Sequence, residues 1–527
     1  MLGNMKKTQS LLAKGLSLSF LTLCSRILGL VREMTKAKFL GTSALSDAFG
    51  IAFQVPNFCR RLFAENSVSV AFIPTFKEHL ETDDKEKTQA FVSATFTLVT
   101  FLTVVFVSLG MIFTPLILRI FFSSQYREAM DESVILTRIM FPYLVVISIA
   151  ALFQGILNGH KIFSPSGFTP ILFNAIVIAS TYILAPHMQN PARAMAVGVI
   201  TGGCVQAAFQ LPFVIKQGWK ISLVPLKKAF TNPGTRKVLT LVAPTIIGMA
   251  AYQLNDIVSS SLATRTGEGV YSSIQYSLRL QELILGICAV TIGTVILPDL
   301  TGFAHNKEWD QFSGMLTLAV KIMAVIAIPI TFYALCMKRQ IITLVFASGR
   351  FDESSIAMTE QVFTYHILGL FFIAVNRIIA PAFYAQQDTK SPTAAGLVNF
   401  AVNITLAYIL SRFMGGSGIA LALTAASIAN MVLLFIFLKR NPVINVGSVI
   451  KSSLLYAVKT VILSALSVIP VWLLREPLST LFAGRNRMIS QGIPVFATAA
   501  LFAAAGVLLL VLTRDPLVKA VVKKLKR

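Results

Sequence analysis

The chain has 527 residues, of which 55% are hydrophobic and only 13% are charged, and its formal net charge is +23. Soluble proteins average about 25% charged residues, so this composition excludes an ordinary soluble protein. Apolar runs of about 20 residues recur along the whole chain, and each is long enough to cross a bilayer as a helix. The alternating pattern of a membrane β-barrel is missing. We therefore predict an all-α polytopic membrane protein.

In chain order, the apolar runs predict about 14 transmembrane helices, each apolar over roughly 20 residues. They lie near residues 10–34, 43–76, 90–121, 134–158, 166–185, 192–215, 238–263, 270–300, 312–346, 357–385, 392–412, 417–438, 449–474 and 490–513. The second and ninth are longer than one span requires, which predicts tilt, a break or a helical extension in each.

Basic residues gather in the connections that follow even-numbered spans. Connection 216–237 holds six basic residues and no acidic one, and the tail "KAVVKKLKR" holds five. Connections after odd-numbered spans are leaner, although "LREPLSTLFAGRNR" carries three arginines. The positive-inside rule places both termini and connection 216–237 in the cytoplasm. Topology therefore explains the positive charge better than nucleic-acid binding does.

The sequence shows neither of two motifs that are typical of redox and zinc sites. The five cysteines form no CxxC pair, and the five histidines form no HExxH motif. Neither a disulfide framework nor a zinc site is therefore predicted. We expect no cofactor.

Two proline landmarks indicate an internal repeat. Pro74 in "VAFIPTF" and Pro298 in "TVILPDL" are 224 residues apart, and Pro165 in "LNGHKIFSP" and Pro392 in "YAQQDTKSP" are 227 apart. Such prolines are also common at helix ends, which is the alternative explanation. If the chain is duplicated, each half holds six spans and both halves have the same orientation.

This repeat predicts three parts: an N-terminal six-helix lobe at 1–220, a C-terminal six-helix lobe at 221–440, and two extra transmembrane helices with a basic cytoplasmic tail at 441–527. Parallel six-helix halves are typical of alternating-access transporters, in which the substrate binds near the midplane.

Charged residues occur inside several predicted spans. The first, second and eighth spans carry them: Arg26, Arg32, Glu33, Asp47, Arg60, Arg61, Glu65, Arg279 and Glu282. One arginine at the bilayer centre costs roughly 2.5–3.5 kcal/mol, so these side chains must face a cavity, a partner or a ligand. Pairing with Asp47 and Glu65 is the alternative, but it leaves arginines in excess. Arginine suits phosphate or carboxylate, which it can bind in a bidentate manner. We therefore expect a cationic cavity for an anionic, phosphorylated substrate.

Three further polar residues are candidates for binding a monovalent cation. Asn399 and Asn403 lie four residues apart in the eleventh span, and Asp256 lies in the seventh. Amides in membrane helices more often form hydrogen bonds between helices. No other metal site is predicted.

The motifs "SRILGLVRE", "SDAFGIAFQVPNFCRRLFAE", "YSLRLQELILGICAVTIGTVILP" and "FYAQQDTKSP" resemble the MurJ/MviN family of bacterial lipid II flippases. This family belongs to the multidrug/oligosaccharidyl-lipid/polysaccharide exporter superfamily. The resemblance covers nearly the whole chain. It implies two six-helix lobes and two additional C-terminal helices.

The resemblance also implies a substrate, a site and a location. The substrate would be lipid II, the undecaprenyl diphosphate that carries the disaccharide-pentapeptide, in the bacterial plasma (inner) membrane among membrane lipids. Arg26, Arg32, Arg60 and Arg279 would bind it, and Glu33, Asp47, Arg61, Glu65 and Glu282 would gate the site or support its charge. The last two helices would frame a groove for the lipid tail. Contact with the cell-wall synthesis machinery would fit this role.

The chain departs from the family pattern at two positions. Asn66 stands where many members have glycine, and Asn403 stands where some have an aspartate implicated in sodium binding. Coupling to the membrane potential or to a monovalent cation therefore stays open.

Three other functions are alternatives to a lipid II flippase. A related exporter could carry drugs or another polyprenyl-linked oligosaccharide, but arginines in the cavity disfavour cationic drugs. A membrane enzyme acting on polyprenyl diphosphates would need a metal-binding carboxylate set or a large outer loop. A structural scaffold would not need arginines at mid-membrane. A transporter, not an enzyme, is the preferred interpretation.

Overall fold

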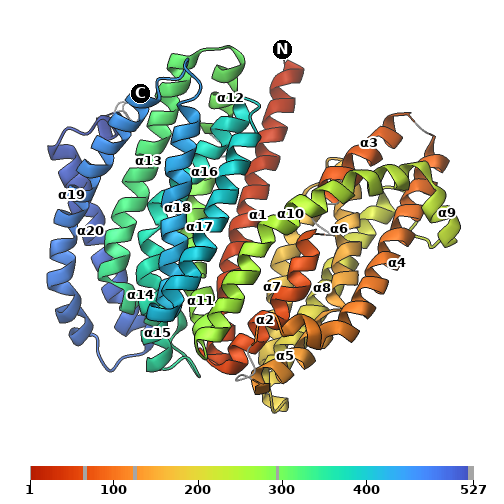
Figure 1. The fold of residues 1–527 in the computed structure, drawn as a ribbon, viewed down its shortest axis with the longest axis horizontal. Coiled ribbons are helices and arrows are strands. Elements are labelled where there is room, and N and C mark those ends of the chain that lie inside the picture. Colours follow the sequence, from red (N-terminus) through yellow and green to blue (C-terminus); the bar gives the residue numbers. More distant parts are fainter. Residues whose placement is uncertain (1, 63–67, 83, 123–126, 292–295, 520–527) are drawn as a thin grey trace. The chain divides into compact units, whose positions relative to one another are not determined.

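The computed structural model describes residues 2–62, 68–82, 84–122, 127–291 and 296–519. Every regular element in these ranges is helical, which confirms the predicted fold class (Figure 1). The earlier α-helices are α1 (Leu2–Leu40), α2 (Ala44–Arg60), α3 (Ile73–Thr82), α4 (Lys85–Leu118), α5 (Arg127–Met140), α6 (Tyr143–Gly159), α7 (Ser164–Leu184), α8 (Pro191–Lys216), α9 (Leu226–Thr231) and α10 (Pro233–Thr266).

The later α-helices continue in the same order. They are α11 (Val270–Thr291), α12 (Leu297–His305), α13 (Trp309–Cys336), α14 (Lys338–Phe346), α15 (Glu353–Leu368), α16 (Leu370–Ala385), α17 (Lys390–Met414), α18 (Gly416–Leu438), α19 (Val446–Leu481) and α20 (Ile493–Leu512). Short π-helices span Val68–Phe72 and Met488–Gly492, and a 3-10 turn spans Ala185–His187.

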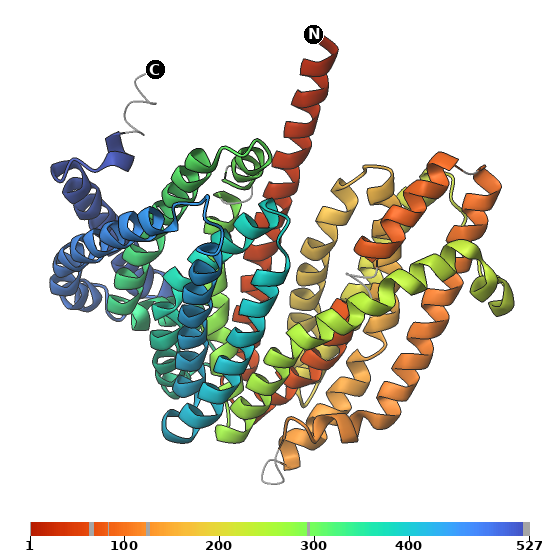
Figure 2. The same ribbon diagram turned by 45° about the horizontal axis from the view of Figure 1, so that its top comes forward.

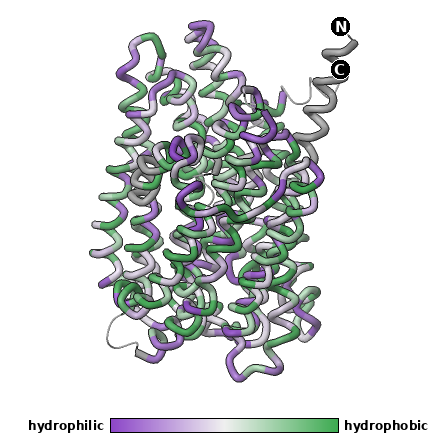
Figure 3. The backbone as a smooth tube through the Cα atoms, turned by 90° about the vertical axis from the view of Figure 1, so that its right-hand side faces the viewer, coloured by the Kyte–Doolittle hydropathy of each residue, from purple (hydrophilic) through white to green (hydrophobic). Residues whose placement is uncertain are grey.

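Among the described residues, nine helical segments are long and apolar enough to cross a membrane, and the pair α15 and α16, bent by 42°, would make a tenth. Figure 3 shows hydrophilic residues mainly at helix ends and turns. Four predicted spans stay outside this set, namely those that overlap α1, α2, α10 and α11. These helices carry the charged and amide side chains considered below. The count of 14 spans stays a prediction.

The two long spans are interrupted, as their length predicted. The second consists of α2, the π-helix Val68–Phe72 and α3, with residues 63–67 outside the described ranges. The ninth is divided at Met337, which separates α13 from α14. Both interruptions shorten the uninterrupted helix toward the length that one bilayer crossing needs.

Two predicted boundaries were wrong. The first helix does not end near residue 34 but continues to Leu40, where Gly41 adopts a φ of 62° and donates its N–H to the Ala37 carbonyl at 2.8 Å. Glycine takes this left-handed conformation without strain, so it ends the helix. The arginine-rich segment after residue 474 is not all loop, because α19 continues to Leu481.

Short polar side chains fix where several helices begin. Asp84 Oδ1 accepts the backbone N–H of Lys87 at 2.9 Å, and Asn190 Oδ1 accepts that of Ala192 at 2.9 Å. Asn232 caps α10 and Asn445 caps α19 in the same way. Each cap satisfies a backbone donor that the helix itself leaves unpaired, so the polar connections set the register of the apolar helices.

The chain divides into two compact units, residues 1–272 and 273–527, which are described separately. In unit 1, α6 and α7 pack on α8, and in unit 2, α16 and α17 pack on α18. Pro74 is the second residue of α3 in unit 1, and Pro298 is the second residue of α12 in unit 2. These parallels agree with an internal repeat, while the predicted lobe boundaries stay predictions.

Unit 2 also holds the two C-terminal helices. Both α13 with α19 and α19 with α20 are packed pairs (Figure 2). The first half of α19 is joined to the segment after α20 by Lys459, whose Nζ lies 2.6 Å from Asp515 Oδ2. Asp515 is 1% exposed and also accepts the Tyr456 hydroxyl at 3.2 Å. This buried contact fixes the α19–α20 hairpin at one end.

Candidate functional site

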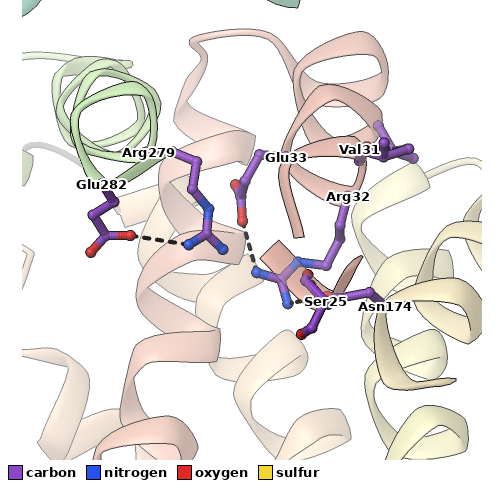
Figure 4. A network of polar contacts seen from close by, with 8 residues as sticks. Ser25, Val31, Arg32, Glu33, Asn174, Arg279 and Glu282 are labelled. Carbon is purple, nitrogen blue, oxygen red and sulfur yellow. Dashed lines mark hydrogen bonds and ion pairs between the residues drawn. The ribbon is translucent and has the colours of Figure 1, made fainter. Parts of the chain in front are cut away.

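Arg32 on α1 lies in a polar cluster within unit 1 (Figure 4). Its guanidinium pairs with Glu33 at 2.9 Å and donates to Asn174 Oδ1 on α7 at 3.1 Å. The Asn174 amide in turn donates to the Ser25 carbonyl at 3.3 Å. The ring of Phe53 lies 5.8 Å from the Arg32 guanidinium. Arg32 is therefore held in place by one carboxylate and one amide.

Arg26 occupies a different environment on the same helix. It is exposed, as are Leu23 and Ile27 beside it. Six residues separate Arg26 from Arg32, which is not a whole number of helical turns, so the two side chains do not leave α1 in the same direction. Their assignment to one cavity that binds the phosphorylated substrate stays a prediction.

The adjacent arginines of α2 contact different partners. Arg60 Nε donates to Asn57 Oδ1 on the same helix at 2.9 Å. Arg61 reaches α10 instead, where its Nη1 donates to Gln253 Oε1 at 3.2 Å and lies 3.4 Å from Asp256 Oδ2. Adjacent helical residues point about 100° apart, which explains the two directions. Arg61 thus ties α2 to α10, and Arg60 does not share that contact.

Asp47 is buried at the start of α2, with 3% of its surface exposed. Its Oδ1 accepts the Ser272 N–H at 2.8 Å and the Ser272 hydroxyl at 2.6 Å, and its Oδ2 accepts the Gly269 N–H at 2.8 Å. The sequence suggested that Asp47 could neutralise an arginine. Its hydrogen bonds instead show a carboxylate that binds Gly269 in the turn before α11 and Ser272 in the first turn of α11.

Two other acidic positions complete the predicted set in this region. Glu65 lies outside the described residues. Asp256 is exposed and pairs with Arg61, while its backbone carbonyl accepts Gln54 Nε2 at 3.3 Å. The candidate cation ligand Asp256 therefore has an arginine as its nearest ionic partner.

In unit 2, Arg279 and Glu282 lie on one face of α11, as their spacing predicted. Arg279 Nη1 lies 3.1 Å from Glu282 Oε2, and the two side chains are 32% and 58% exposed (Figure 4). The other face of α11 is anchored to α15. Ser277 Oγ lies 2.7 Å from Nδ1 of the buried His366, and the Gln281 amide donates to the His366 carbonyl. This anchoring orients the helix so that Arg279 remains accessible.

The remaining cation candidates, Asn399 and Asn403, lie on α17 in unit 2. Asn403 is buried and Asn399 is half-buried. No group of three or more histidine, cysteine, aspartate or glutamate residues gathers anywhere in the described ranges. The structure therefore brings no carboxylate cluster to these two amides.

Several residues of these networks were not predicted to hold an arginine or to belong to the site. Asn174 and Gln253 each hold an arginine, and Lys36 is 5% exposed within electrostatic range of Glu33 and Asp47. An amide inside an apolar span is a detectable signal, because such groups need a partner in the membrane. Lys36 was not considered as a site residue, because the first predicted span ends near residue 34.

A groove in unit 2 lies along α13, α19 and α20. Its volume is about 400 Å³, and the residues that line it are mostly aliphatic or small, including Ile330, Leu463, Phe502, Ala503, Gly506 and Leu510. Tyr333 at this groove donates its hydroxyl to the Val495 carbonyl at 2.6 Å, which satisfies its only polar atom. The groove is thus suited to an apolar chain.

Comparison with known proteins gives consistent matches over most of the chain. The family model described as "Lipid II flippase MurJ" matches residues 36–489. A probable lipid II flippase MurJ of Treponema pallidum is 45% identical over 517 residues, which cover 97% of each chain. The lipid II flippase MurJ of Burkholderia cenocepacia is 32% identical over 433 residues and covers 81% of this chain and 83% of its own.

Solved structures show the same fold. One described as lipid II flippase MurJ in an inward closed conformation matches with a TM-score of 0.77 at 25% identity and covers 94% of this chain and 99% of its own. An inward-facing multidrug MATE transporter of the MOP superfamily matches with a TM-score of 0.66 at 13% identity, over 82% of this chain and 99% of its own. The second match concerns the fold alone.

Proposed function

Because the chain belongs to the MurJ family of lipid II flippases, we propose that it moves lipid II from the cytoplasmic to the outer leaflet of the plasma membrane for cell-wall synthesis. It acts as a transporter and works by alternating access. The observation that carries the proposal is the family match over nearly the full chain together with arginines inside otherwise apolar helices.

Arg26, Arg32, Arg60 and Arg279 bind the diphosphate of the substrate. Arg32 and Arg279 support this assignment best, because each has a neighbouring carboxylate, Glu33 or Glu282, on its own helix. Such a partner holds the guanidinium in position without substrate and can be replaced by a phosphate oxygen, since guanidinium binds phosphate in a bidentate manner. Arg61 and Asp47 have supporting roles, because their contacts join α2 to α10 and to the turn before α11.

The polyprenyl tail of the substrate occupies the groove along α13, α19 and α20. The groove offers aliphatic side chains and few polar groups, which is the environment that a hydrocarbon chain requires. The head group and the tail would therefore bind to different parts of the protein. This separation lets the charged head group cross while the tail remains in an apolar environment.

Both termini and connection 216–237 face the cytoplasm, as the distribution of basic residues indicates. With this orientation, a membrane potential that is negative inside favours outward movement of anionic charge by roughly 2.3 kcal/mol per charge per 100 mV. Asp256, Asn399 and Asn403 are the candidate ligands if a monovalent cation contributes. The protein works beside the enzymes that consume lipid II outside.

The test is to deplete the protein in living cells and to measure how much lipid II an externally added lipid II-degrading enzyme can reach. We expect the accessible fraction to fall on depletion and to recover with the wild-type gene. A variant with Arg32→Ala and Arg279→Ala should be produced and inserted but should not restore it. Unchanged access after complete depletion, in cells without another flippase, would contradict the proposal.

A further inference from the structure

The two units contain the same hydrogen bond at equivalent places. In unit 1, Trp219 lies three residues after the end of α8 and donates its Nε1–H to Nε2 of His160, the residue after α6, at 2.8 Å. In unit 2, Asn441 lies three residues after the end of α18 and donates Nδ2–H to Oε1 of Gln386, the residue after α16, at 2.9 Å. In unit 1 the contact joins the connection after α6 to the connection after α8. In unit 2 the contact joins the connection after α16 to the connection after α18.

The backbone after each acceptor also agrees. Lys161 follows His160 with a φ of 61°, and Gln387 follows Gln386 with a φ of 60°. A positive φ in a residue other than glycine is uncommon, so the match shows that the two helix ends have the same local geometry. The two contacts are thus structural equivalents, although their side chains differ.

In unit 1 the space at this place is filled by an indole ring. Trp219 is 4% exposed, and its ring centroid lies 5.5 Å from that of Phe76 and 5.9 Å from that of His160. It belongs to a buried aromatic cluster that also contains Phe72 and Phe91. This end of unit 1 is therefore closed by a side chain of its own connection.

In unit 2 the equivalent donor is the much smaller Asn441, and a cavity of about 740 Å³ opens beside it. Its walls come from the end of α12, the start of α13, the α16–α17 turn and the end of α18. All three connections follow even-numbered spans and are predicted to be cytoplasmic. Cavities of roughly 300–1,000 Å³ are typical of small-molecule sites.

The lining indicates which ligand would fit. Trp309, Tyr384 and Phe437 contribute aromatic rings, and the Arg440 guanidinium lies 4.5 Å from the ring centroid of Phe437. An aromatic ring can stack on such walls, and the guanidinium can pair with an anionic group.

The carboxylate of Asp388 also lies at the cavity, but it already has partners. Its Oδ1 accepts the backbone N–H groups of Lys390 and Ser391 at 3.0 Å each, so its charge is committed to the start of α17. These donors stabilise its negative charge but do not remove it, so the anionic group is expected to bind on the Arg440 side of the cavity, next to Phe437.

We propose that this cavity is a cytoplasmic binding site for a small aromatic anion, a planar ring that carries a carboxylate or a phosphate. The ring takes the place that the Trp219 indole takes in unit 1, and the anionic group pairs with Arg440. None of the four arginines assigned to the diphosphate lines this cavity, and the proposal does not rest on the proposed transport function.

The experiment measures binding to the full-length protein in lipid nanodiscs by calorimetry. Two probes distinguish the anions, indole-3-propionate for carboxylate and adenosine monophosphate for phosphate, while indole and propionate test the ring and the charge separately. We expect saturable binding of at least one aromatic anion, about tenfold tighter than that of indole or propionate, because indole lacks the charge-assisted hydrogen bond to Arg440 and propionate lacks the ring contact.

Two variants locate the site. Asn441→Trp places the residue found in unit 1 in the cavity and should abolish binding of the aromatic anions. Arg440→Gln should weaken the binding of the aromatic anions about tenfold and leave the binding of indole unchanged. Val443→Trp is the matched control, because Val443 is 51% exposed in the same connection and does not line the cavity. Its binding should equal that of the wild type. A stable wild-type protein that binds neither aromatic anion, or an Asn441→Trp variant that binds as the wild type does, would overturn the proposal.

Discussion

Gly269 donates its backbone N–H to Asp47 Oδ2 at 2.8 Å, and this contact closes the start of α2 on the turn before α11. The turn depends on glycine, because Gly269 has a φ of 74° and an added Cβ would lie 2.4 Å from the Thr42 carbonyl oxygen. Nearby, Gly50 leaves room for the Tyr271 ring, which a Cβ would meet at 2.3 Å. One buried carboxylate and two glycines thus hold the segments together.

We predict that Asp47→Ala lowers the free energy of unfolding by several kcal/mol. The change leaves the Gly269 and Ser272 N–H groups buried without an acceptor, and each unsatisfied donor costs about 1–3 kcal/mol. Thermal unfolding of the purified protein in detergent measures the loss. Glu81→Gln serves as the control, because Glu81 is an exposed carboxylate and its change should have little effect. Equal unfolding temperatures for Asp47→Ala and wild type would contradict the assignment.

We predict that the Arg279→Lys variant supports far less transport than expected from the positive charge that lysine retains. Lysine cannot hold a phosphate with two parallel hydrogen bonds, and the loss of one charge-assisted bond of 1.5–3 kcal/mol corresponds to a loss of about tenfold or more. Growth of cells that depend on the variant gene measures the effect. Arg412→Lys should be tolerated, because Arg412 is exposed at the end of α17 and contacts the neighbouring Tyr408 on the same helix.

Exchange of the charges separates phosphate binding from simple pairing. With glutamate at 279 and arginine at 282, the ion pair is retained but the guanidinium moves by three residues along α11. We expect this double variant to be inserted and inactive. Full growth of the double variant would mean that the role of Arg279 is to pair with Glu282.

Acid should loosen the contact between Trp219 and His160. Burial lowers the pKa of His160 below its usual value of 6.5, so the folded state favours the neutral ring. The contribution of His160 to the free energy of unfolding is therefore present above pH 6.5 and is lost as the pH falls through the lowered pKa of His160. A protonated ring also cannot accept the Trp219 N–H.

The measurement is Trp219 emission from pH 8 to pH 4 in a protein that carries Trp309→Phe and Trp472→Phe. We expect a transition below pH 6.5. His160→Gln should remove it, because glutamine does not take up a proton in this pH range and can still accept the hydrogen bond, as Gln386 does in unit 2. A transition that persists in the glutamine variant would assign the effect to another group.

Connection 216–237 should be inaccessible from outside the cell. Leu223 is 69% exposed, so Leu223→Cys places a reactive thiol on this connection in a protein that carries Cys204→Ser. A thiol reagent that does not cross membranes should leave it unlabelled in intact cells. Gln189→Cys, in the connection after the fifth span, should be labelled under the same conditions. The reverse pattern would invert the topology.

A bulky side chain in the groove of unit 2 should impair transport. Ala503 lines the groove and Ala504, its exposed neighbour on α20, does not. We expect Ala503→Trp to occupy part of the 400 Å³ volume and to slow lipid II transfer severalfold by competing with the hydrocarbon tail. Ala504→Trp adds the same ring outside the groove and should leave transfer unchanged. Similar rates for both variants would show that the tail does not use this groove.

The sequence predicts the helices well because their signal is local. Runs of apolar residues and polar caps such as Asp84 and Asn190 lie within a few positions of the helix ends that they determine. The interruption at Met337 follows from length alone, since the predicted ninth span was too long for a bilayer. Likewise, the pairing of Arg279 with Glu282 follows from their spacing on one helix.

Partners that are distant in the sequence could not be predicted in this way. The contacts of Arg61 with Gln253 and of Asp47 with Gly269 join residues about two hundred positions apart, and no local pattern connects them. Two of the three Asp47 donors are backbone N–H groups, so their presence depends on the conformation of a turn and not on residue type. The cavity beside Asn441 was not predicted, because its walls come from segments that are far apart in the sequence.

The charged side chains carried by α1, α2, α10 and α11 have a consequence for how the protein is made. Segments leave the ribosome in order and partition into lipid according to their apolar content, and a central arginine opposes that step. In the predicted repeat, these four segments are the first pair of each half, so each half begins with helices that carry charges at depth. Their stable insertion then requires the more apolar helices that are synthesised later. The charges that suit transport thus delay completion of each half during biogenesis.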